Sequence, residues 1–276
     1  MRPLHKILKE IITKKEIKKM PASFDVIGEI AIIEVPKELK KKEKKIAQKI
    51  IETFKQVKTV AKKAGIHKGE FRTRKTKIIG GEKTKETIQK ESGTIIKLNI
   101  DKCYYSPRYG TERLRIAKQV KEGEKILVMF SGVGPFPLVI AKNSKPEKIV
   151  GVEKNPECHK YALENKKLNK KTGEKIEFIE GDVKNIVPKI KNQFDRVAMP
   201  LPKGGENFLS TAIRAVKPGG ILHFYDFATP EKFEESANKI IEECKKEKRK
   251  CKVLRITKCG EVKPRTYRIC IDATIT

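Results

Sequence analysis

The sequence predicts an α/β fold with a mainly parallel, seven-stranded sheet, preceded by a smaller α+β domain. Beyond residue 101, short apolar segments alternate with helical segments, which is typical of a parallel sheet covered on both faces. A glycine-rich turn follows the first of these strand segments. The first hundred residues instead combine one long amphipathic pattern with several short strand patterns. We therefore expect two domains, at residues 1–100 and 101–276.

The chain carries a large excess of positive charge. It holds 64 Lys and Arg against 35 Asp and Glu, a formal net charge of +29. A hot or salty habitat would enrich charges of both signs, whereas this excess favours a polyanionic partner such as nucleic acid. No segment approaches the ~18 apolar residues of a membrane span, and the N-terminus lacks the apolar core of a secretory signal. We expect a soluble, cytoplasmic protein.

The six cysteines show no metal-binding spacing. They lie at positions 103, 158, 244, 251, 259 and 270, without any C-x-x-C pair and without nearby histidine clusters. A zinc site is therefore not expected, and a cytosolic chain keeps such thiols reduced. Most of them read as core residues, although a disulfide among the last four stays open for a hyperthermophilic host.

The small domain is expected to begin with a short lysine-rich helix over the first twenty residues. A β-branched run at residues 25–36, with a glycine inside, predicts a strand or a bent pair of strands. Apolar residues at a spacing near 3.6 predict one amphipathic helix over residues 38–64. Its lysine-rich face suits either solvent or RNA. Short strands are expected at 72–75, 78–81 and 94–100.

The large domain is expected to start with a helix at residues 110–119. Strands are predicted at 125–130, 148–153, 176–179, 195–199, 220–225 and 251–256. Helices are predicted between them at 137–143, 156–168, 205–216 and 230–246. The final run, 266–275, follows an expected turn around Cys259 and Gly260 and adds an antiparallel edge strand.

The turn after the first strand of the large domain has the features of a cofactor-binding loop. Phe130 is followed by Gly132 and Gly134, and a helix begins near Pro135. Glycines let the backbone approach a ligand, and the helix N-terminus presents free N–H groups to it. Glu153 lies 19 positions past Gly134, at the end of the second strand, where a carboxylate can bind a ribose diol.

A third sequence element narrows the choice of cofactor. Gly181, Asp182 and Val183 follow the third strand, where an acid and the next backbone N–H can read an adenine edge. The loop also lacks the third glycine of the dinucleotide fingerprint. These features predict S-adenosylmethionine rather than a nicotinamide cofactor. A tight turn without a ligand is the alternative.

Several motifs together resemble one enzyme family. They are YYSPRYGTERLRIA at 104–117, FSGVGPF at 130–136, EKNP at 153–156 and LPK at 201–203. Upstream, SFDVIGEIA at 23–31 and GEFR at 69–72 belong to the same pattern. The chain resembles the archaeal and eukaryotic tRNA (guanine-37 N1)-methyltransferases from about residue 20 onward. A related family is the wybutosine-pathway aminocarboxypropyltransferase, which shares the fold and the cofactor.

The resemblance implies a Rossmann-like class I methyltransferase domain behind a small basic RNA-binding domain, acting on the anticodon stem-loop of tRNA. Nothing in the sequence demands a dimer, so we expect a monomer. Glu112 matches the family's general base for the guanine N1 proton, and Arg72 matches the cation that supports charge on O6. The implied cofactor positions are Ser106, Arg113, Phe130, Gly132, Gly134, Pro135, Glu153, Lys154, Asp182, Val183 and Pro200.

Three departures from the family pattern keep other interpretations open. Val128 stands where the first strand usually carries an acid, and Pro200 replaces the asparagine of an Asn-Leu-Pro motif. We expect a carbonyl at Met199 or Pro200 to substitute for the lost amide. Only about 20 residues precede the segment that matches the family's middle domain, so the family's additional N-terminal domain is expected to be absent. The rival interpretations are aminocarboxypropyl transfer and a tRNA-binding protein with a degenerate site.

The candidate catalytic residues also have structural alternatives. Glu112 and Arg113 share a helix with Arg115 and lie close to Arg108, so they could form an ordinary ion-pair cluster. Arg72, taken alone in a basic hairpin, could serve as a routine phosphate contact.

Overall fold

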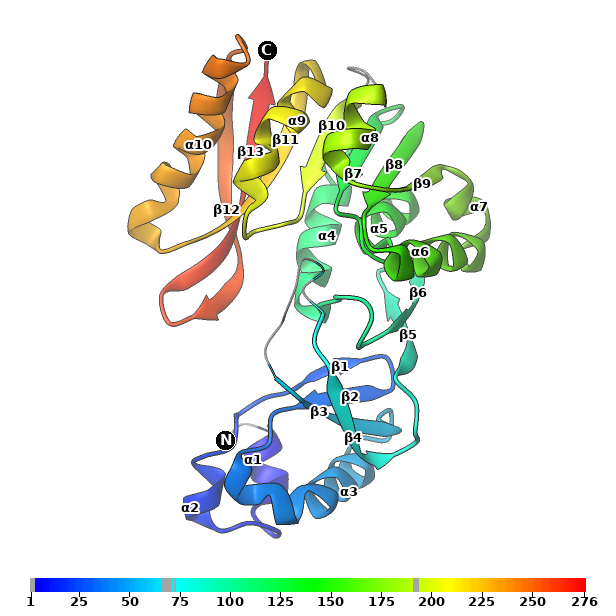
Figure 1. Cartoon of the computed structure of the whole chain (residues 1–276), viewed down its shortest axis with the longest axis vertical. Helices are drawn as coiled ribbons and strands as arrows, with labels where there is room; N and C mark the ends of the chain where they lie inside the picture. Colours follow the sequence, from blue (N-terminus) through cyan, green and yellow to red (C-terminus); the bar gives the residue numbers. More distant parts are fainter. Residues whose placement is uncertain (1–2, 66–70, 72, 191–193) are drawn as a thin grey trace. The chain divides into compact units, whose positions relative to one another are not determined.

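In the computed structural model, residues 3–65, 71, 73–190 and 194–276 are described, and the chain forms two compact units (Figure 1). The first unit comprises Met1–Lys90 and Ile95–Pro107, and the second comprises Glu91–Thr94 and Arg108–Thr276. Each unit has its own buried core. Among the described residues, no helix combines the length and apolar character that crossing a bilayer requires.

The first unit is built on a four-stranded sheet in the order β1-β2-β3-β4. Strands β2 and β3 are parallel, and the outer pairs are antiparallel. Helix α3 (Glu43–Thr53) buries Ile46, Ala47 and Ile50 against this sheet. The remaining elements are α1 (Pro3–Leu8), α2 (Lys14–Ile17), β1 (Asp25–Ile27), β2 (Ile30–Ile33), η1 (Lys37–Lys42), β3 (Thr59–Lys63), β4 (Thr76–Gly81) and the two-stranded sheet of β5 (Glu86–Glu91) and β6 (Thr94–Asn99).

Two expectations for the first unit are wrong. The first twenty residues form two short helices rather than one, because a capping box at Thr13 starts the second helix. The helix expected over residues 38–64 ends at Thr53, and residues 59–63 form β3 instead. Tertiary pairing outweighs the helical periodicity there, since β3 hydrogen-bonds to strands on both sides.

The strand expected at residues 72–75 is not found at its described positions beyond an isolated bridge at Thr73. Strand β5 was not expected at all. Its sequence, ETIQKE, buries only Thr87 and is otherwise polar or charged, so it lacks the apolar alternation that marks a half-buried strand.

The second unit contains a seven-stranded sheet in the order β12-β13-β11-β10-β7-β8-β9. Strands β7 to β11 are mutually parallel, and β13 runs antiparallel to its two neighbours. This confirms the predicted mainly parallel, seven-stranded sheet. Its strands are β7 (Lys125–Met129), β8 (Lys148–Glu153), β9 (Ile176–Glu180), β10 (Phe194–Met199), β11 (Val216–Ala228), β12 (Cys251–Lys263) and β13 (Thr266–Ile275).

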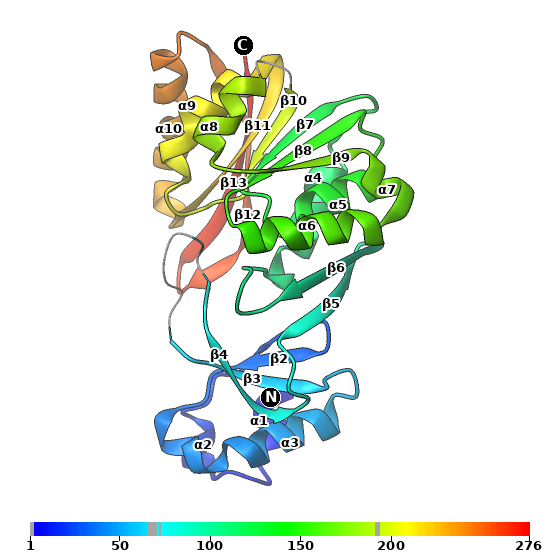
Figure 2. The same cartoon turned by 45° about the vertical axis from the view of Figure 1, so that its right-hand side comes forward.

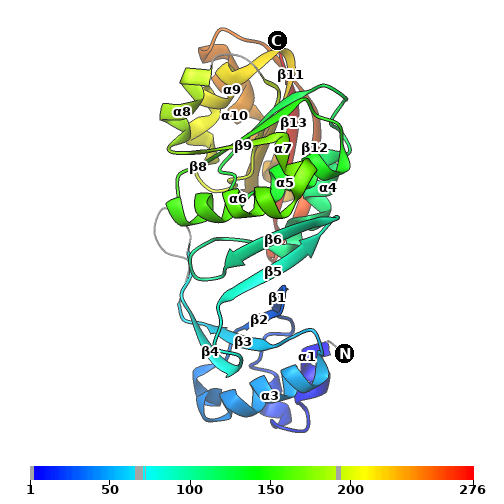
Figure 3. The ribbon, with the colours of Figure 1, turned by 90° about the vertical axis from the view of Figure 1, so that its right-hand side faces the viewer.

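Helices cover both faces of this sheet (Figures 2 and 3). Helices α4, α5 and α6 lie on one face, and α8, α9 and α10 lie on the other. Their bounds, with the shorter helical segments, are η2 (Pro107–Tyr109), α4 (Gly110–Ala117), α5 (Pro135–Asn143), α6 (Pro156–Leu168), α7 (Lys170–Glu174), α8 (Val183–Ile190), η3 (Gly205–Phe208), α9 (Leu209–Ala215), η4 (Pro230–Lys232) and α10 (Phe233–Lys246).

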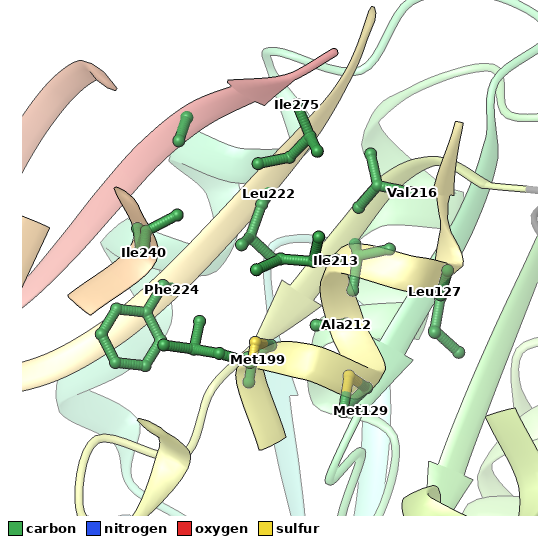
Figure 4. Close-up of a cluster of buried hydrophobic side chains, with 14 of the residues drawn as sticks. Leu127, Met129, Met199, Ala212, Ile213, Val216, Leu222, Phe224, Ile240 and Ile275 are labelled. Atoms are coloured by element: carbon green, nitrogen blue, oxygen red, sulfur yellow. The ribbon is translucent and has the colours of Figure 1, made fainter. Parts of the chain in front are cut away.

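The two faces of β11 and β13 differ in chemistry. Leu222, Phe224 and Ile275 join the apolar core beneath α9 and α10 (Figure 4). The alternating positions carry His223, Tyr225 and Asp272, which are also buried. Because successive side chains of a strand point to opposite faces, these polar groups lie on the α4 side of the sheet.

Several details of the second unit differ from expectation. Helices α7 and α8 were not foreseen; α8 is short and contains Pro188, which weakens its helical signal. Strand β12 continues through Cys259 and Gly260 to Lys263, so the expected turn is wrong and the chain reverses at residues 264–265. Strand β13 lies between β11 and β12 rather than at the edge. All six cysteines are free.

Candidate active site

The glycine loop connects β7 to α5. Phe130, Gly132 and Gly134 have φ values of 56°, 58° and 88°, in the left-handed region. A Cβ on Gly134 would lie 2.6 Å from the Phe178 ring, so both backbone and space require glycine there. Helix α5 begins at Pro135, directly after the loop. Pro135 and Pro137 carry no backbone N–H, so of its first three positions Phe136 alone offers one at this edge of the sheet. The loop is therefore a cradle that a side chain would fill.

Glu153 ties the end of β8 to this loop. Its carboxylate accepts hydrogen bonds from the Gly132 amide at 2.8 Å and the Asn155 amide at 2.7 Å. Burial raises the pKa of Glu153 above its ordinary value, against the opposing effect of these amides. Each carboxylate oxygen has two acceptor positions, so the group can bind both the loop and a ribose diol.

The residues after β9 form a neighbouring polar group. Asp182 accepts hydrogen bonds from the Lys184 amide at 2.9 Å and from Lys154 Nζ at 3.0 Å. The Lys184 amide and Lys154 hold the pKa of Asp182 below its ordinary value despite partial burial. Val183 is buried at the start of α8. Four of the expected cofactor residues thus follow the carboxyl ends of β8 and β9, where parallel α/β sheets bind ligands.

The segment after β10 contributes aromatic packing. The ring of Phe208 packs edge-on against that of Phe130, with 4.9 Å between centroids, at the residue that has the left-handed backbone conformation. Pro200 follows β10 and is half-buried. The Met199 carbonyl, one expected substitute for the missing amide, accepts a hydrogen bond from the Leu201 amide at 2.7 Å. Val128 is fully buried in β7.

Glu112 is buried on α4 and held by two side chains. Arg115 donates to both carboxylate oxygens, from Nε at 2.7 Å and Nη2 at 2.8 Å. The Tyr225 hydroxyl donates to Oε1 at 2.7 Å. Burial raises the pKa of Tyr225 well above its ordinary value, so the phenol stays neutral and acts as a donor. Three hydrogen bonds therefore fix the orientation of the Glu112 carboxylate, and Arg115 pairs with its charge.

Arg115 also joins Glu112 to a deeper buried network. Its Nη1 donates to Asp272 at 2.7 Å, and His223 Nδ1 lies 2.7 Å from the other Asp272 oxygen. Burial lowers the pKa of His223, so the ring is neutral; its Nδ1–H donates to Asp272, and its Nε2 accepts from Arg196 at 2.7 Å. Although burial opposes it, His223 and Arg115 hold the pKa of Asp272 well below its usual range.

These groups form three levels between α4 and the sheet, which we call the polar ladder. The strand register pairs His223 with Asp272, Tyr225 with Cys270 and Phe227 with Arg268. Helix residues three apart face successive levels: Arg115 binds Asp272, Glu112 binds Tyr225, and Tyr109 stacks on Arg268. Sequence reasoning missed the strand residues of the ladder. The polar residues at every second position of 268–272 were the available signal.

The other expected site residues have different surroundings. Arg113 is almost fully buried, and its guanidinium binds Glu91 through two hydrogen bonds of 2.5 Å. Ser106 is half-buried just before η2, in the first unit. Arg72 lies outside the described residues. The ion pairs expected as the structural alternative for Glu112 and Arg113 thus exist, and the functional roles of both residues stay predictions.

Two further features of the second unit bear on ligand binding. His223, Cys270 and Asp272 offer three potential metal ligands within 4.8 Å, but Arg115 and Arg196 contact the same groups, and their charges oppose a cation. A cavity of about 500 Å³ lies at the opposite edge of the sheet, lined by residues 121–124 and 217–221. Two cations that line this cavity already have acidic partners: Lys217 pairs with Asp195, and Arg196 pairs with Glu124.

Comparison with known proteins places these features in a family. The TRM5/TYW2 methyltransferase domain model matches residues 87–254, and the TYW2 N-terminal domain model matches residues 4–84. The tRNA (guanine(37)-N(1))-methyltransferase Trm5b of Pyrococcus abyssi is 40% identical over 93% of this chain and 76% of its own length. The tRNA(Phe) (4-demethylwyosine(37)-C(7)) aminocarboxypropyltransferase of Pyrococcus horikoshii is 31% identical over 83% of this chain and 80% of its own.

A solved structure gives the same assignment. The complex of aTrm5 and tRNALeu has a chain that is 31% identical, with a TM-score of 0.87, and the match covers all of this chain and 79% of that one. The Rossmann-like methyltransferase fold and the S-adenosylmethionine cofactor expected from the sequence are confirmed. The chain belongs to the TRM5/TYW2 family of S-adenosylmethionine-dependent tRNA methyltransferases.

Proposed function

We propose that this enzyme transfers the methyl group of S-adenosylmethionine to N1 of guanine-37 in tRNA. The observation that carries the proposal is the packing of Phe136 against Tyr225, with 6.0 Å between ring centroids. Phe136 directly follows the glycine loop, and Tyr225 binds Glu112. The candidate cofactor loop and the candidate base are therefore joined by a single aromatic contact. The similarity to Trm5b of Pyrococcus abyssi supports the same reaction.

The cradle fits the cofactor. When bound, S-adenosylmethionine supplies an electrophilic methyl group on a sulfonium centre. Gly132 and Gly134 leave room for the backbone to approach it, and Glu153 offers carboxylate acceptors to the ribose diol. Asp182 and the Val183 amide follow β9, and in this proposal they contact the adenine edge. Lys154 orients Asp182 through its hydrogen bond.

The chemistry at guanine requires a base. N1 becomes nucleophilic only after it loses its proton, and a carboxylate within hydrogen-bond distance can accept that proton. In this proposal Glu112 is the acceptor. Arg115 and Tyr225 hold the carboxylate in one orientation before the substrate arrives, which lowers the cost of reaching the reactive geometry.

The RNA partner follows from charge and from the family. The net charge of +29 supports capture of tRNA phosphates, and the target base is splayed out of the anticodon loop to reach Glu112. The first unit is proposed to bind the RNA, and the anticodon stem-loop is the proposed contact region. All proposed site residues come from one chain, which supports a monomeric enzyme, and tRNA as substrate supports a cytoplasmic location.

A methyl-transfer assay tests the reaction. Purified protein is incubated with S-adenosylmethionine and tRNA carrying guanine-37, and the nucleosides are analysed by mass spectrometry. We expect 1-methylguanosine. Glu112→Gln keeps the shape of the side chain but replaces one acceptor oxygen, which faces Arg115, with an N–H donor and removes the basic carboxylate. Turnover should therefore fall roughly 100-fold or more while cofactor affinity stays unchanged. The exposed Glu242→Gln serves as a control. An equal loss of cofactor binding in Glu112→Gln would assign Glu112 a structural role.

A second reaction is aminocarboxypropyl transfer from the same cofactor to a modified guanine-37. The similarity to the aminocarboxypropyltransferase of Pyrococcus horikoshii favours it, as does the match of residues 4–84 to the TYW2 N-terminal domain model. The two reactions add groups of different mass, so the same analysis with 4-demethylwyosine-containing tRNA distinguishes them. Transfer of the larger group alone would replace the methyltransferase proposal.

A further inference from the structure

Arg268 is a buried cation without an acidic partner in the described part of the chain. Its side chain lies on β13, the residue is 8% exposed, and Nε is fully buried without a hydrogen-bond acceptor among the described residues. Three other arginines of this unit each bind a carboxylate: Arg113 binds Glu91, Arg115 binds Glu112 and Asp272, and Arg196 binds Glu124. An unpaired buried charge is costly, so its retention calls for an anion that arrives from outside.

The surroundings of Arg268 fix its orientation. Its guanidinium carbon lies 3.5 Å from the centroid of the Tyr109 ring, and the Phe227 ring lies 5.9 Å away. Stacking on Tyr109 covers one face of the planar guanidinium, whereas its N–H groups lie in the plane of the group, so the ring does not occupy them. The group is therefore held in advance with its donors in a fixed fork, the geometry that suits phosphate oxygens.

Arg268 occupies the level of the polar ladder nearest the carboxyl end of β11. It pairs with Phe227, one residue before β11 ends. Tyr109, on which it stacks, precedes Glu112 by three residues at the start of α4. The Cys259 thiol is influenced by both groups: burial raises its pKa, Glu112 raises it further, and Arg115 and Arg268 lower it. Arg268 thus lies beside the proposed base, at the ligand-binding edge of the sheet.

We propose that Arg268 binds a backbone phosphate of the nucleotide whose base enters the active site. The inference rests on the proposed function for the identity of the nucleic acid. A phosphate can supply the full negative charge that would pair with the buried guanidinium, whereas a base carbonyl offers only a partial charge. Arg268 is therefore a positioning residue that sets where the target nucleotide lies relative to Glu112.

The test is a binding cycle that does not depend on turnover. Dissociation constants are measured for wild type and Arg268→Met with unmodified tRNA and with tRNAs bearing a methylphosphonate 5′ or 3′ of nucleotide 37. We expect Arg268→Met to weaken binding roughly 10- to 100-fold, as for loss of a hydrogen bond to a charged group, and to reduce the salt dependence by about one phosphate. One methylphosphonate should weaken wild type but cause no further loss in Arg268→Met.

Controls separate this role from stability. Arg255→Met removes an exposed arginine from β12 and should change binding much less. Cofactor affinity, measured by calorimetry, should be unchanged in Arg268→Met, and Arg268→Lys should recover part of the tRNA affinity. If Arg268→Met does not fold, the cycle is run with Arg268→Lys and Arg268→Gln.

Three results would overturn the proposal. The first is unchanged tRNA binding in Arg268→Met. The second is that the loss of affinity in Arg268→Met adds to the loss from each of the two methylphosphonates. The third is that the loss in Arg268→Met does not add to the loss from 2-aminopurine at position 37, which would assign the contact to the base. Failure of methyl transfer with an intact binding cycle would instead contradict the proposed function alone.

Discussion

Removing Arg115 should destabilise the second unit far more than removing an exposed arginine. Arg115 is the shared partner of Glu112 and Asp272, which are 5% and 3% exposed. Arg115→Met leaves two buried carboxylates without the cation that they share. Breaking a buried ion pair from one side typically costs about 3–5 kcal/mol, so we expect the free energy of unfolding to fall by that amount.

The matched control is Arg265→Met. Arg265 forms an ion pair with Glu231 in which both side chains are exposed, by 77% and 58%, so the same chemical change should cost less than about 1 kcal/mol. Both variants are unfolded in urea and followed by circular dichroism. In Arg115→Met/Asp272→Asn one of the two orphaned charges is neutral, and part of the loss should be recovered. Equal midpoints for Arg115→Met and Arg265→Met would refute the argument that the ladder is held by buried charge pairing.

Three further outcomes are expected. Gly134→Ala should lose cofactor affinity and stability because its Cβ would lie 2.6 Å from Phe178. The control is Gly219→Ala, a position with a similar φ but open space around the added Cβ. Both variants carry roughly 1–2 kcal/mol of backbone strain, so the difference between them in calorimetry measures the effect of the contact. Glu153→Gln should weaken cofactor binding roughly 10-fold or more by turning an N–H donor toward the Gly132 amide, and unchanged affinity would contradict its role. The pKa of Asp272 is depressed in the folded state. The stabilisation that this carboxylate gives the folded protein is therefore complete above its unfolded pKa of about 3.9 and is lost as the pH falls below it. Acid unfolding curves should therefore be shallower for Asp272→Asn than for wild type.

The sequence predicted the elements of the second unit best where the local pattern indicated only one type of secondary structure. Strands β8 and β13 and helix α6 match their expected bounds, since β-branched runs and long helical patterns are locally unambiguous there. The long helix of the first unit was overextended because Val57, Val60 and Ala61 continue a spacing near 3.6. Only pairing with β2 and β4 decides that residues 59–63 form a strand, and that pairing is not visible locally.

The site was predictable to the extent that it is local in sequence. Gly132 and Glu153 could be connected because β7 and β8 are consecutive, and a strand–loop–helix–strand unit brings such positions together. The partners of Glu112 could not be found in this way. Tyr225 and Asp272 lie more than 100 residues further along, and their proximity depends on the insertion of β13 between β11 and β12. No spacing rule specifies that insertion from one sequence.

The polar ladder is better explained by function than by stability. A buried ion pair can often be replaced by apolar residues of similar size without loss, and sometimes with a gain, because desolvation consumes most of the Coulomb energy. The opposite face of the same strands shows that this chain packs apolar residues there readily. A stabilising role alone would therefore not require charges beneath α4. What the charges add is a carboxylate that stays buried, oriented and paired next to the cofactor loop, with Arg268 one level away for the nucleotide. Substitutions in the ladder should accordingly impair turnover even where compensating apolar changes restore the free energy of unfolding.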